Sequence, residues 1–128
     1  MKKILVVEDD ESLLQVLKHV LLREGYPIEV SLNAQDALRK ISAEAFDLVV
    51  LDLMLPGGNG YDILREIQQM GRPETGVVII TGKLLAANTE EMLRRESNVV
   101  EFLRKPLNYP RLVSVINKAL KSDPKKPS

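Results

Sequence analysis

The amino-acid sequence predicts a doubly wound α/β domain, in which a parallel β-sheet carries helices on both faces. The chain has 128 residues, about the length of one compact domain. Short and almost continuous runs of Val, Ile and Leu are typical of strands that are covered on both faces. Segments with helical periodicity alternate with these runs, which indicates parallel strands joined by right-handed crossovers.

Composition excludes several classes of protein. Hydrophobic residues make up 45% of the chain and charged residues 28%, which excludes disorder, collagen and coiled coil. The 18 Lys and Arg residues balance 18 Asp and Glu residues, so no overall charge favours direct binding to nucleic acid or to a membrane. Cys is absent, which excludes disulfides, zinc fingers and thiol catalysis and leads us to expect a cytoplasmic protein. No apolar run approaches the roughly 18 residues that a membrane span needs.

Five strands are expected. The first lies at residues 4–7, directly before an acidic segment. The second lies at residues 28–32, where apolar and polar residues alternate as in an edge strand with one wetter face. The remaining three are expected at residues 48–51, 77–80 and, less purely apolar, 99–103.

The helices that follow the first two strands each have one apolar face. In the first helix this face is formed by Leu13, Leu17, Val20 and Leu21. Gly25 is expected to end that helix. The second helix spans about residues 34–42 with Asn33 as its N-cap. Its apolar face is formed by Ala34, Ala37, Leu38 and Ile41.

Three further helices are expected in the second half of the chain. The third spans about residues 61–70 and the fifth about residues 110–121. The fourth spans about residues 89–96, where Asn88 and Glu91 have the spacing of a capping box. Its residues expected to face the sheet are Met92 and Leu93.

The common order of a five-stranded sheet of this kind is 2-1-3-4-5, and its ligands bind outside the carboxyl ends of strands 1 and 3. The residues after Val7 and Leu51 should therefore face one another. Those residues are acidic: Glu8, Asp9 and Asp10 after the first strand, and Asp52 after the third.

Carboxylates that converge in this way repel one another unless they hold a cation. An oxygen-only site with few protein ligands suits Mg²⁺, which phosphate oxygens usually complete. Thr81 follows the fourth strand and Lys105 the fifth, so a hydroxyl and an ammonium group reach the same edge. These groups are suited to the oxygens of a phosphoryl group. Taken alone, the residues 8–10 would equally suit a helix N-terminus.

The sequence closely resembles the receiver domain of two-component response regulators over about residues 3–121. The matching residues are segments 4–10 and 47–52 together with Pro56, Gly60, Thr81, Lys105 and Pro106. The resemblance implies a flavodoxin-like (βα)5 fold. It also implies a receiver domain over residues 1–121, with residues 122–128 as a flexible tail or linker.

By this resemblance, Asp52 accepts a phosphoryl group from a sensor histidine kinase or a phosphotransfer protein. The resemblance implies a Mg²⁺ site of Glu8, Asp9, Asp52 and Met54, in which Asp9, Asp52 and the Met54 carbonyl are direct ligands. Asp10 matches a variable position and is not expected to be a ligand.

The resemblance also implies how a signal would leave the site. Lys105 would bind the phosphoryl group, Thr81 would close on it, and Phe102 would rotate inward. The Lys105–Pro106 bond would be cis. The surface of the fourth helix, fifth strand and fifth helix would then act on a downstream protein or an output domain, and a phosphorylation-dependent dimer is compatible with this.

The sequence departs from the family pattern at three places. The segment between Thr81 and Lys105 is a couple of residues longer than usual. Asn98 stands where Gly is common, and Asn tolerates the left-handed turn expected there. Gly82 stands where Ala is common, which predicts a wider route to an acyl phosphate.

Other readings are weaker. A phosphohydrolase of the haloacid-dehalogenase type needs a second acid two residues after its nucleophile, where this chain has Met54. A phosphate-binding loop from Gly76 to Lys83 has the wrong spacing, and Leu84 follows the Lys. The lone His19 is expected on an exposed helix face. The serious alternative is a receiver-like interaction module that works without phosphorylation, and neither reading makes the chain an enzyme acting on other molecules.

Overall fold

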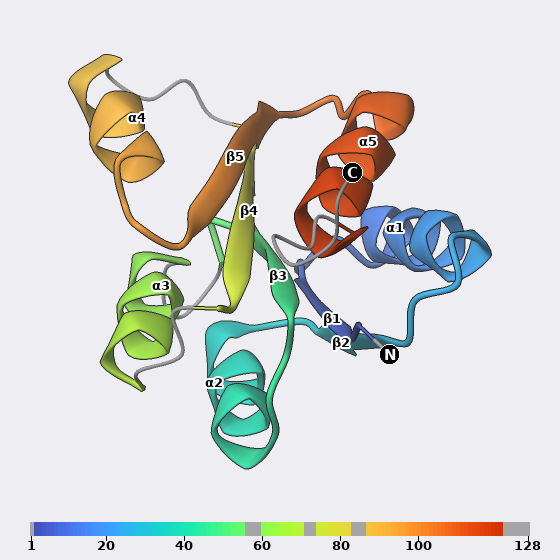
Figure 1. Cartoon of the computed structure of the whole chain (residues 1–128), viewed down its shortest axis with the longest axis horizontal. Helices are drawn as coiled ribbons and strands as arrows, with labels where there is room; N and C mark the ends of the chain where they lie inside the picture. Colours follow the sequence, from blue (N-terminus) through green and yellow to red (C-terminus); the bar gives the residue numbers. More distant parts are fainter. Residues whose placement is uncertain (1, 56–59, 71–73, 83–86, 122–128) are drawn as a thin grey trace.

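The computed structural model describes residues 2–55, 60–70, 74–82 and 87–121. Five parallel strands form one sheet in the order β2-β1-β3-β4-β5, which confirms the predicted fold class and strand order (Figure 1). The strands are β1 (Ile4–Val7), β2 (Ile28–Ser31), β3 (Leu48–Asp52), β4 (Gly76–Thr81) and β5 (Val99–Arg104). The helices are α1 (Glu11–Arg23), α2 (Ala34–Ala43), α3 (Gly60–Gln69), α4 (Ala87–Arg94) and α5 (Tyr109–Lys121). Pro56 and the expected tail at 122–128 lie outside the described residues.

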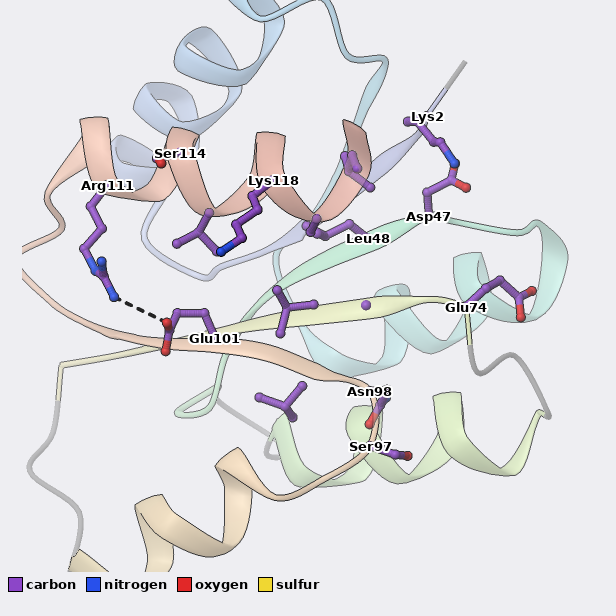
Figure 2. Close-up of a pocket in the computed structure, with 16 residues that line it drawn as sticks. Lys2, Asp47, Leu48, Glu74, Ser97, Asn98, Glu101, Arg111, Ser114 and Lys118 are labelled. Atoms are coloured by element: carbon purple, nitrogen blue, oxygen red, sulfur yellow. Dashed lines mark hydrogen bonds and ion pairs between the residues drawn. The ribbon is translucent and has the colours of Figure 1, made fainter. Parts of the chain in front are cut away.

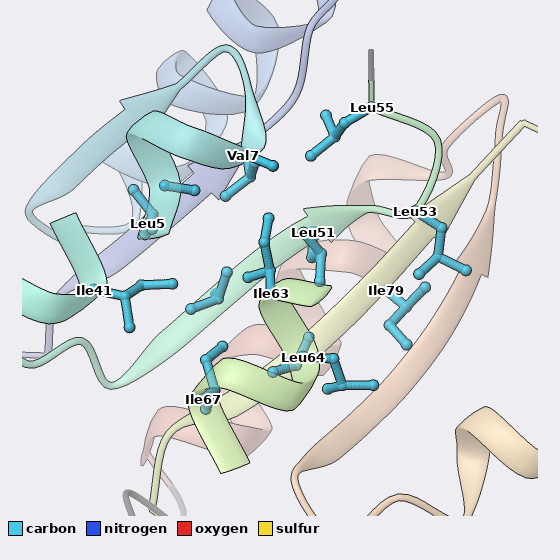
Figure 3. Packing of buried hydrophobic residues seen from close by; sticks show 14 of the residues in the cluster. Leu5, Val7, Ile41, Leu51, Leu53, Leu55, Ile63, Leu64, Ile67 and Ile79 are labelled. Atoms are coloured by element: carbon cyan, nitrogen blue, oxygen red, sulfur yellow. The ribbon is translucent and has the colours of Figure 1, made fainter. Parts of the chain in front are cut away.

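The sheet separates two apolar cores, because successive residues of each buried strand point to opposite faces. On one face, Leu5 and Val7 of β1 pack with residues of α2 and α3 (Figure 3). On the other face, Ile4 and Val6 pack with α1 and α5. Near-continuous apolar strands are therefore needed in the three central positions, as the sequence predicted.

Capping residues fix where the first two helices begin and end. Asp10 caps α1 by accepting hydrogen bonds from the N–H groups of Ser12 and Leu13 (2.9 and 3.2 Å). Asn33 caps α2 through the N–H of Asp36 (2.8 Å), as predicted. Gly25 follows α1 with a φ of 91°, a conformation that Gly adopts without strain.

The structure corrects the predictions in three elements. In α1, Leu17 and Leu21 are buried as predicted, but the third buried residue is Leu14, and Leu13 is only partly buried against the core. In β2 the expected alternation fails, because Ser31 is buried and Leu32 is exposed beyond the strand end. In α4, Asn88 lies inside the helix and cannot be its N-cap, and of the pair Met92 and Leu93 only Leu93 is buried.

Asn98, before β5, does not adopt the left-handed conformation expected of it, because no described non-glycine residue has a positive φ. A tight turn forms instead, in which Val99 N–H donates to Glu96 O (3.0 Å). Asn98 O in turn accepts a hydrogen bond from Val77 N–H of the neighbouring β4 (2.7 Å). A bulge follows, since Val77 pairs with Val99 and Val78 with Glu101. This leaves Val100 partly exposed at the outer edge of the sheet.

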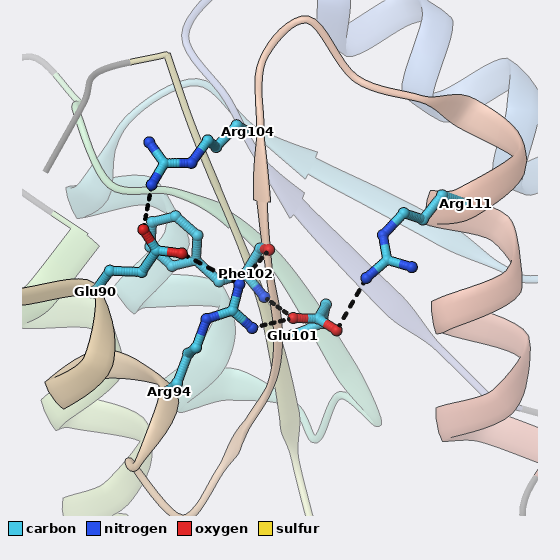
Figure 4. A network of polar contacts seen from close by, with 6 residues as sticks. All are labelled: Glu90, Arg94, Glu101, Phe102, Arg104 and Arg111. Atoms are coloured by element: carbon cyan, nitrogen blue, oxygen red, sulfur yellow. Dashed lines mark hydrogen bonds and ion pairs between the residues drawn. The ribbon is translucent and has the colours of Figure 1, made fainter. Parts of the chain in front are cut away.

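An arginine network attaches α4 and α5 to β5. We use this name for Glu90, Arg94, Glu101, Arg104 and Arg111 (Figure 4). Glu101 pairs with Arg94 of α4 and with Arg111 of α5 (3.3 Å), while Glu90 pairs with Arg94 (3.2 Å) and Arg104. The guanidinium groups of Arg94 and Arg104 lie 5.6 and 5.9 Å from the centre of the Phe102 ring. Polar contacts therefore supply much of what fixes α4 to the sheet.

Candidate functional site

The acidic residues converge at the carboxyl end of the sheet, as predicted. β1 and β3 are neighbours with Val7 opposite Leu51, so the residues that follow them leave the sheet side by side. Glu8, Asp9 and Asp52 each offer a carboxylate oxygen, and these oxygens lie within 4.8 Å of one another. Glu8 and Asp52 are buried and Asp9 is exposed, so the cluster opens to solvent on one side.

Glu8 is held in place by the backbone around it. Its N–H donates to Ser31 O of the edge strand β2 (3.0 Å), and its Oε2 accepts a hydrogen bond from Asp10 N–H (3.0 Å). Burial raises the pKa of Glu8, although Lys105 and the Asp10 N–H act in the opposite direction. Asp10 itself caps α1 through its side chain.

Asp52 ends β3, and both of its carboxylate oxygens are engaged. Oδ1 accepts a hydrogen bond from Met54 N–H (2.9 Å), and Oδ2 lies 3.1 Å from Lys105 Nζ. The start of α3 packs directly behind it, because a Cβ on Gly60 would lie 2.9 Å from Asp52 O and 2.9 Å from Leu53 Cα. Only Gly permits this approach, so Gly60 fixes the position of the strand end.

Lys105 brings a positive charge into the carboxylate cluster. Its Nζ lies 2.8 Å from Glu8 Oε1 and 3.1 Å from Asp52 Oδ2. Burial lowers the pKa of this ammonium group, but the contacts with Glu8 and Asp52 more than offset it, so the pKa is raised and the group stays charged. The Lys105–Pro106 bond is cis, as the resemblance implied.

The remaining predicted residues surround this cluster. Thr81 is buried at the end of β4, and its carbonyl accepts a hydrogen bond from Lys105 N–H (2.8 Å). Met54 is exposed beside the cluster. The Phe102 ring is already buried in the core shared with α2 and α3, so an inward orientation needs no rotation from this structure.

Two structural contributions were not predicted from the sequence. One is the specific cap by Asp10, whose N–H also positions Glu8; the sequence indicated only that residues 8–10 would suit a helix N-terminus. The Asp at the end of the acidic segment and directly before a helix is a signal that could have revealed it. The other is Arg104, which pairs in register with Thr81 and forms an ion pair with Glu90 of α4. No spacing in the sequence indicates that contact.

The donor set fits a hard divalent cation. Carboxylate oxygens from two strand ends face one another, and such oxygens are the ligands that Mg²⁺ prefers. Stabilising the oxygens of a phosphoryl group further needs a cationic side chain beside the carboxylates, and Lys105 lies there.

A cleft of about 760 Å³ lies elsewhere, between α5 and the amino ends of β3, β4 and β5 (Figure 2). Residues lining it include Leu48, Val100, Arg111 and Lys118, and none of the carboxylates of the site lines it. Its size therefore says nothing about the chemistry at the opposite edge of the sheet. Among the described helices, none combines the length and the apolar character that crossing a bilayer requires.

Known proteins match the chain over almost its whole length. A family model described as the response regulator receiver domain matches residues 4–117. The response regulator ArlR of Staphylococcus aureus is 32% identical over 126 residues, which cover 98% of this chain and 56% of ArlR. The chain thus spans about half the length of the curated relatives it matches.

Solved structures match the fold as well. A CheY-like receiver domain protein from Methanospirillum hungatei JF-1 is 30% identical with a TM-score of 0.85, and the match covers 94% of each chain. TrrA of Thermotoga maritima, solved in complex with Mg²⁺ and BeF, is 29% identical with a TM-score of 0.79; the match covers 93% of this chain and 99% of TrrA.

Proposed function

This chain belongs to the response regulator receiver family, and we propose that its phosphoacceptor is Asp52. The observation that carries the proposal is the meeting of Glu8, Asp9 and Asp52 with Lys105 at one edge of the sheet. A receiver-like module that works without phosphorylation is less well supported, because every residue type that the transfer needs is present.

The transfer requires a nucleophile and positive charge around the phosphorus. An Asp52 carboxylate oxygen forms a bond to phosphorus while the bond from phosphorus to the donor's histidine nitrogen breaks, and the electron pair leaves with that nitrogen. Lys105 neutralises charge on the transferring oxygens and already lies 3.1 Å from Asp52 Oδ2. Thr81, at the end of the neighbouring strand, donates its hydroxyl to a phosphoryl oxygen.

Asp9, Asp52 and the Met54 carbonyl would bind Mg²⁺ directly, with Glu8 as the second residue of the acidic pair. A bound Mg²⁺ supplies charge neutralisation at the phosphoryl oxygens. The likeness to TrrA, which was solved with Mg²⁺ and BeF, supports this assignment. The same residues would allow self-catalysed loss of the phosphoryl group, with no reaction on other molecules.

The partners follow from the same assignment. The phosphoryl donor would be a sensor histidine kinase or a phosphotransfer protein, in the cytoplasm. The receiver domain would comprise residues 1–121, with residues 122–128 as a tail or linker. The signal would leave through α4, β5 and α5, because closure of Thr81 stabilises the buried packing of Phe102.

Phosphorylation is tested by incubating the protein with acetyl phosphate and Mg²⁺ and measuring its intact mass. We expect one phosphoryl adduct on the wild type and none on Asp52→Asn. Asp47→Asn is the matched control, because Asp47 lies at the amino end of the same strand, where its carboxylate accepts a hydrogen bond from Lys3 N–H (2.8 Å). An adduct on Asp52→Asn, or one that forms equally well without Mg²⁺, would contradict the proposal.

Mg²⁺ binding is tested with two variants that each remove one charge from the acidic segment. Asp9→Asn removes a ligand, so we expect Mg²⁺ affinity to fall by about tenfold or more. Asp10→Asn keeps the α1 cap, since Asn caps as well as Asp, and affinity should change less than about twofold. Equal losses in a Mg²⁺ titration would show that only the overall negative charge matters.

A further inference from the structure

The face formed by α4, β5 and α5 carries a hollow of about 320 Å³. The three arginines of the network line it, together with the buried Phe102 and Leu103 and the exposed Pro106. The hollow is separate from the carboxylate site, whose acidic residues do not line it. The charge that this hollow presents to a partner depends on which side chains of the arginine network are exposed.

The carboxylates of this network lie beneath and the guanidinium groups outside. The side chains of Arg94, Arg104 and Arg111 are 47%, 44% and 57% exposed. Those of Glu90 and Glu101 are only 18% and 21% exposed. A partner that approaches this face therefore meets cations first, even though the whole chain has no net charge.

The charges within the network do not cancel. Each carboxylate is shared by two arginines, Glu90 by Arg94 and Arg104, and Glu101 by Arg94 and Arg111. Three guanidinium groups against two carboxylates leave one positive charge. Burial raises the pKa of Glu101, but the Phe102 N–H and Arg94 more than offset it, so the pKa is lowered and Glu101 is ionised at neutral pH.

Guanidinium groups held in this way are suited to carboxylates. A planar guanidinium can donate two parallel hydrogen bonds to one carboxylate, and arginines that are already positioned by ion pairs lose less freedom on binding. Arg is also enriched among the residues that dominate binding energy at protein interfaces. The exposed ion pair between Glu91 of α4 and Arg95, the residue directly after that helix, is locally neutral and lies outside the hollow.

We propose that this hollow docks an acidic protein segment, whose carboxylates pair with Arg94, Arg104 and Arg111 and whose apolar side chain packs against the exposed Pro106. The proposal rests on the proposed function only in that both use the same face as the output surface. It identifies the downstream partner by chemistry, as a segment in which Asp or Glu residues flank an apolar residue.

The test measures binding of a fluorescein-labelled peptide of about ten residues in which Glu flanks Leu, with the beryllofluoride-treated full chain. We expect each of Arg94→Gln, Arg104→Gln and Arg111→Gln to weaken binding by about fivefold or more, because each removes a charge-assisted contact. Arg95→Gln is the matched control and should change affinity by less than about twofold. A peptide with Lys in place of Glu should not bind.

Three results would overturn the proposal: no binding of the Glu peptide to the wild type, an equal loss in Arg95→Gln, or an oligonucleotide that binds as tightly as the peptide. Thermal unfolding of each variant identifies any that fails to fold. If one arginine variant fails, the peptide affinities of the other two test the proposal. The phosphoryl adduct on Asp52 is measured on the same samples. An intact adduct with no peptide binding therefore rejects the docking surface alone.

Discussion

α3 and α4 pack against the same face of the sheet but are attached by different forces. α3 buries Ile63, Leu64 and Ile67 in the core. Among the described side chains of α4, only Leu93 belongs to that core, and the arginine network supplies the other contacts. Apolar packing depends on shape and has few alternatives, whereas partly exposed ion pairs exchange at low free-energy cost. We therefore expect α3 to be a rigid support for Asp52 and α4 to be the helix that responds to it.

The largest effect should come from the core under α3. Ile67→Ala leaves a cavity in a fully packed region and should lower the free energy of unfolding by about 2–5 kcal/mol. Met92→Ala, on the exposed side of α4, should change it by less than about 0.5 kcal/mol. Urea unfolding measures both, and similar losses would show that the two helices are attached alike.

Gly60→Ala should give the next largest effect, because its Cβ would meet the backbone of Asp52 and Leu53 at 2.9 Å. We expect a loss of about 1–3 kcal/mol and weaker Mg²⁺ binding, since α3 would push the strand end aside. Gly82→Ala is the control, because its Cβ would lie at an ordinary 3.6 Å from Lys105 Cδ. If Gly60→Ala were as stable as the wild type, α3 would not be needed to hold the end of β3 at Asp52.

On the α3 side of the molecule, a polar contact also ties β2 to α2. Hydrogen bonds from Ser31 Oγ and Arg39 are the main reason that the pKa of Asp36 falls from 3.8 to about 2. A lowered pKa stabilises the fold above about pH 4, and this contribution is lost as the pH falls toward 2. Asp36→Asn should therefore cost about 1–2 kcal/mol at pH 7, after allowance for partial exposure, and less at pH 3.

Urea unfolding at both pH values checks this expectation. Glu91→Gln is the control, because Glu91 is exposed on α4 and pairs only with Arg95 in the described structure. A loss in Asp36→Asn that stays constant between pH 7 and pH 3 would exclude the ionised carboxylate as its cause.

The smallest effect is expected in the arginine network. Glu101→Gln should cost less than about 1 kcal/mol in overall stability, because its partners Arg94 and Arg111 are about half exposed. Amide hydrogens of α4 should nevertheless exchange several-fold faster than in the wild type. Unchanged exchange in α4 would mean that Leu93 alone fixes this helix.

The sequence predicts those parts of this molecule that follow a regular pattern of apolar and polar residues. Continuous apolar runs identified the buried strands, and strand order then placed Glu8 beside Asp52. Asn33 was identified as a cap because its contact with Asp36 is local. These features depend on neighbours in the chain or on the topology of the whole sheet.

The features that the sequence did not predict depend on particular contacts between distant residues. In α1 the prediction chose Leu13 instead of Leu14. Both lie on possible apolar faces of the helix, and only packing against the sheet decides that Leu14 is the buried one. α4 has a single buried anchor, so its period is weak and its start was misplaced. The side chain of Val100 in the bulge occupies space that the absence of a side chain on Gly76 leaves free. A Cβ on Gly76 would lie 2.7 Å from Val100 Cγ2.

Hydrogen exchange with and without beryllofluoride and Mg²⁺ tests most directly whether the site at Asp52 acts on the α4 side of the molecule. Thr81 is in register with Arg104, which contacts both Phe102 and Glu90. A change at Thr81 would therefore reach α4 through Arg104. We predict that protection changes concentrate in α4, β5 and the first turn of α5, and that Asp52→Asn shows none. Changes concentrated in α1 and α2 would contradict this account and leave Phe102 as a core residue only.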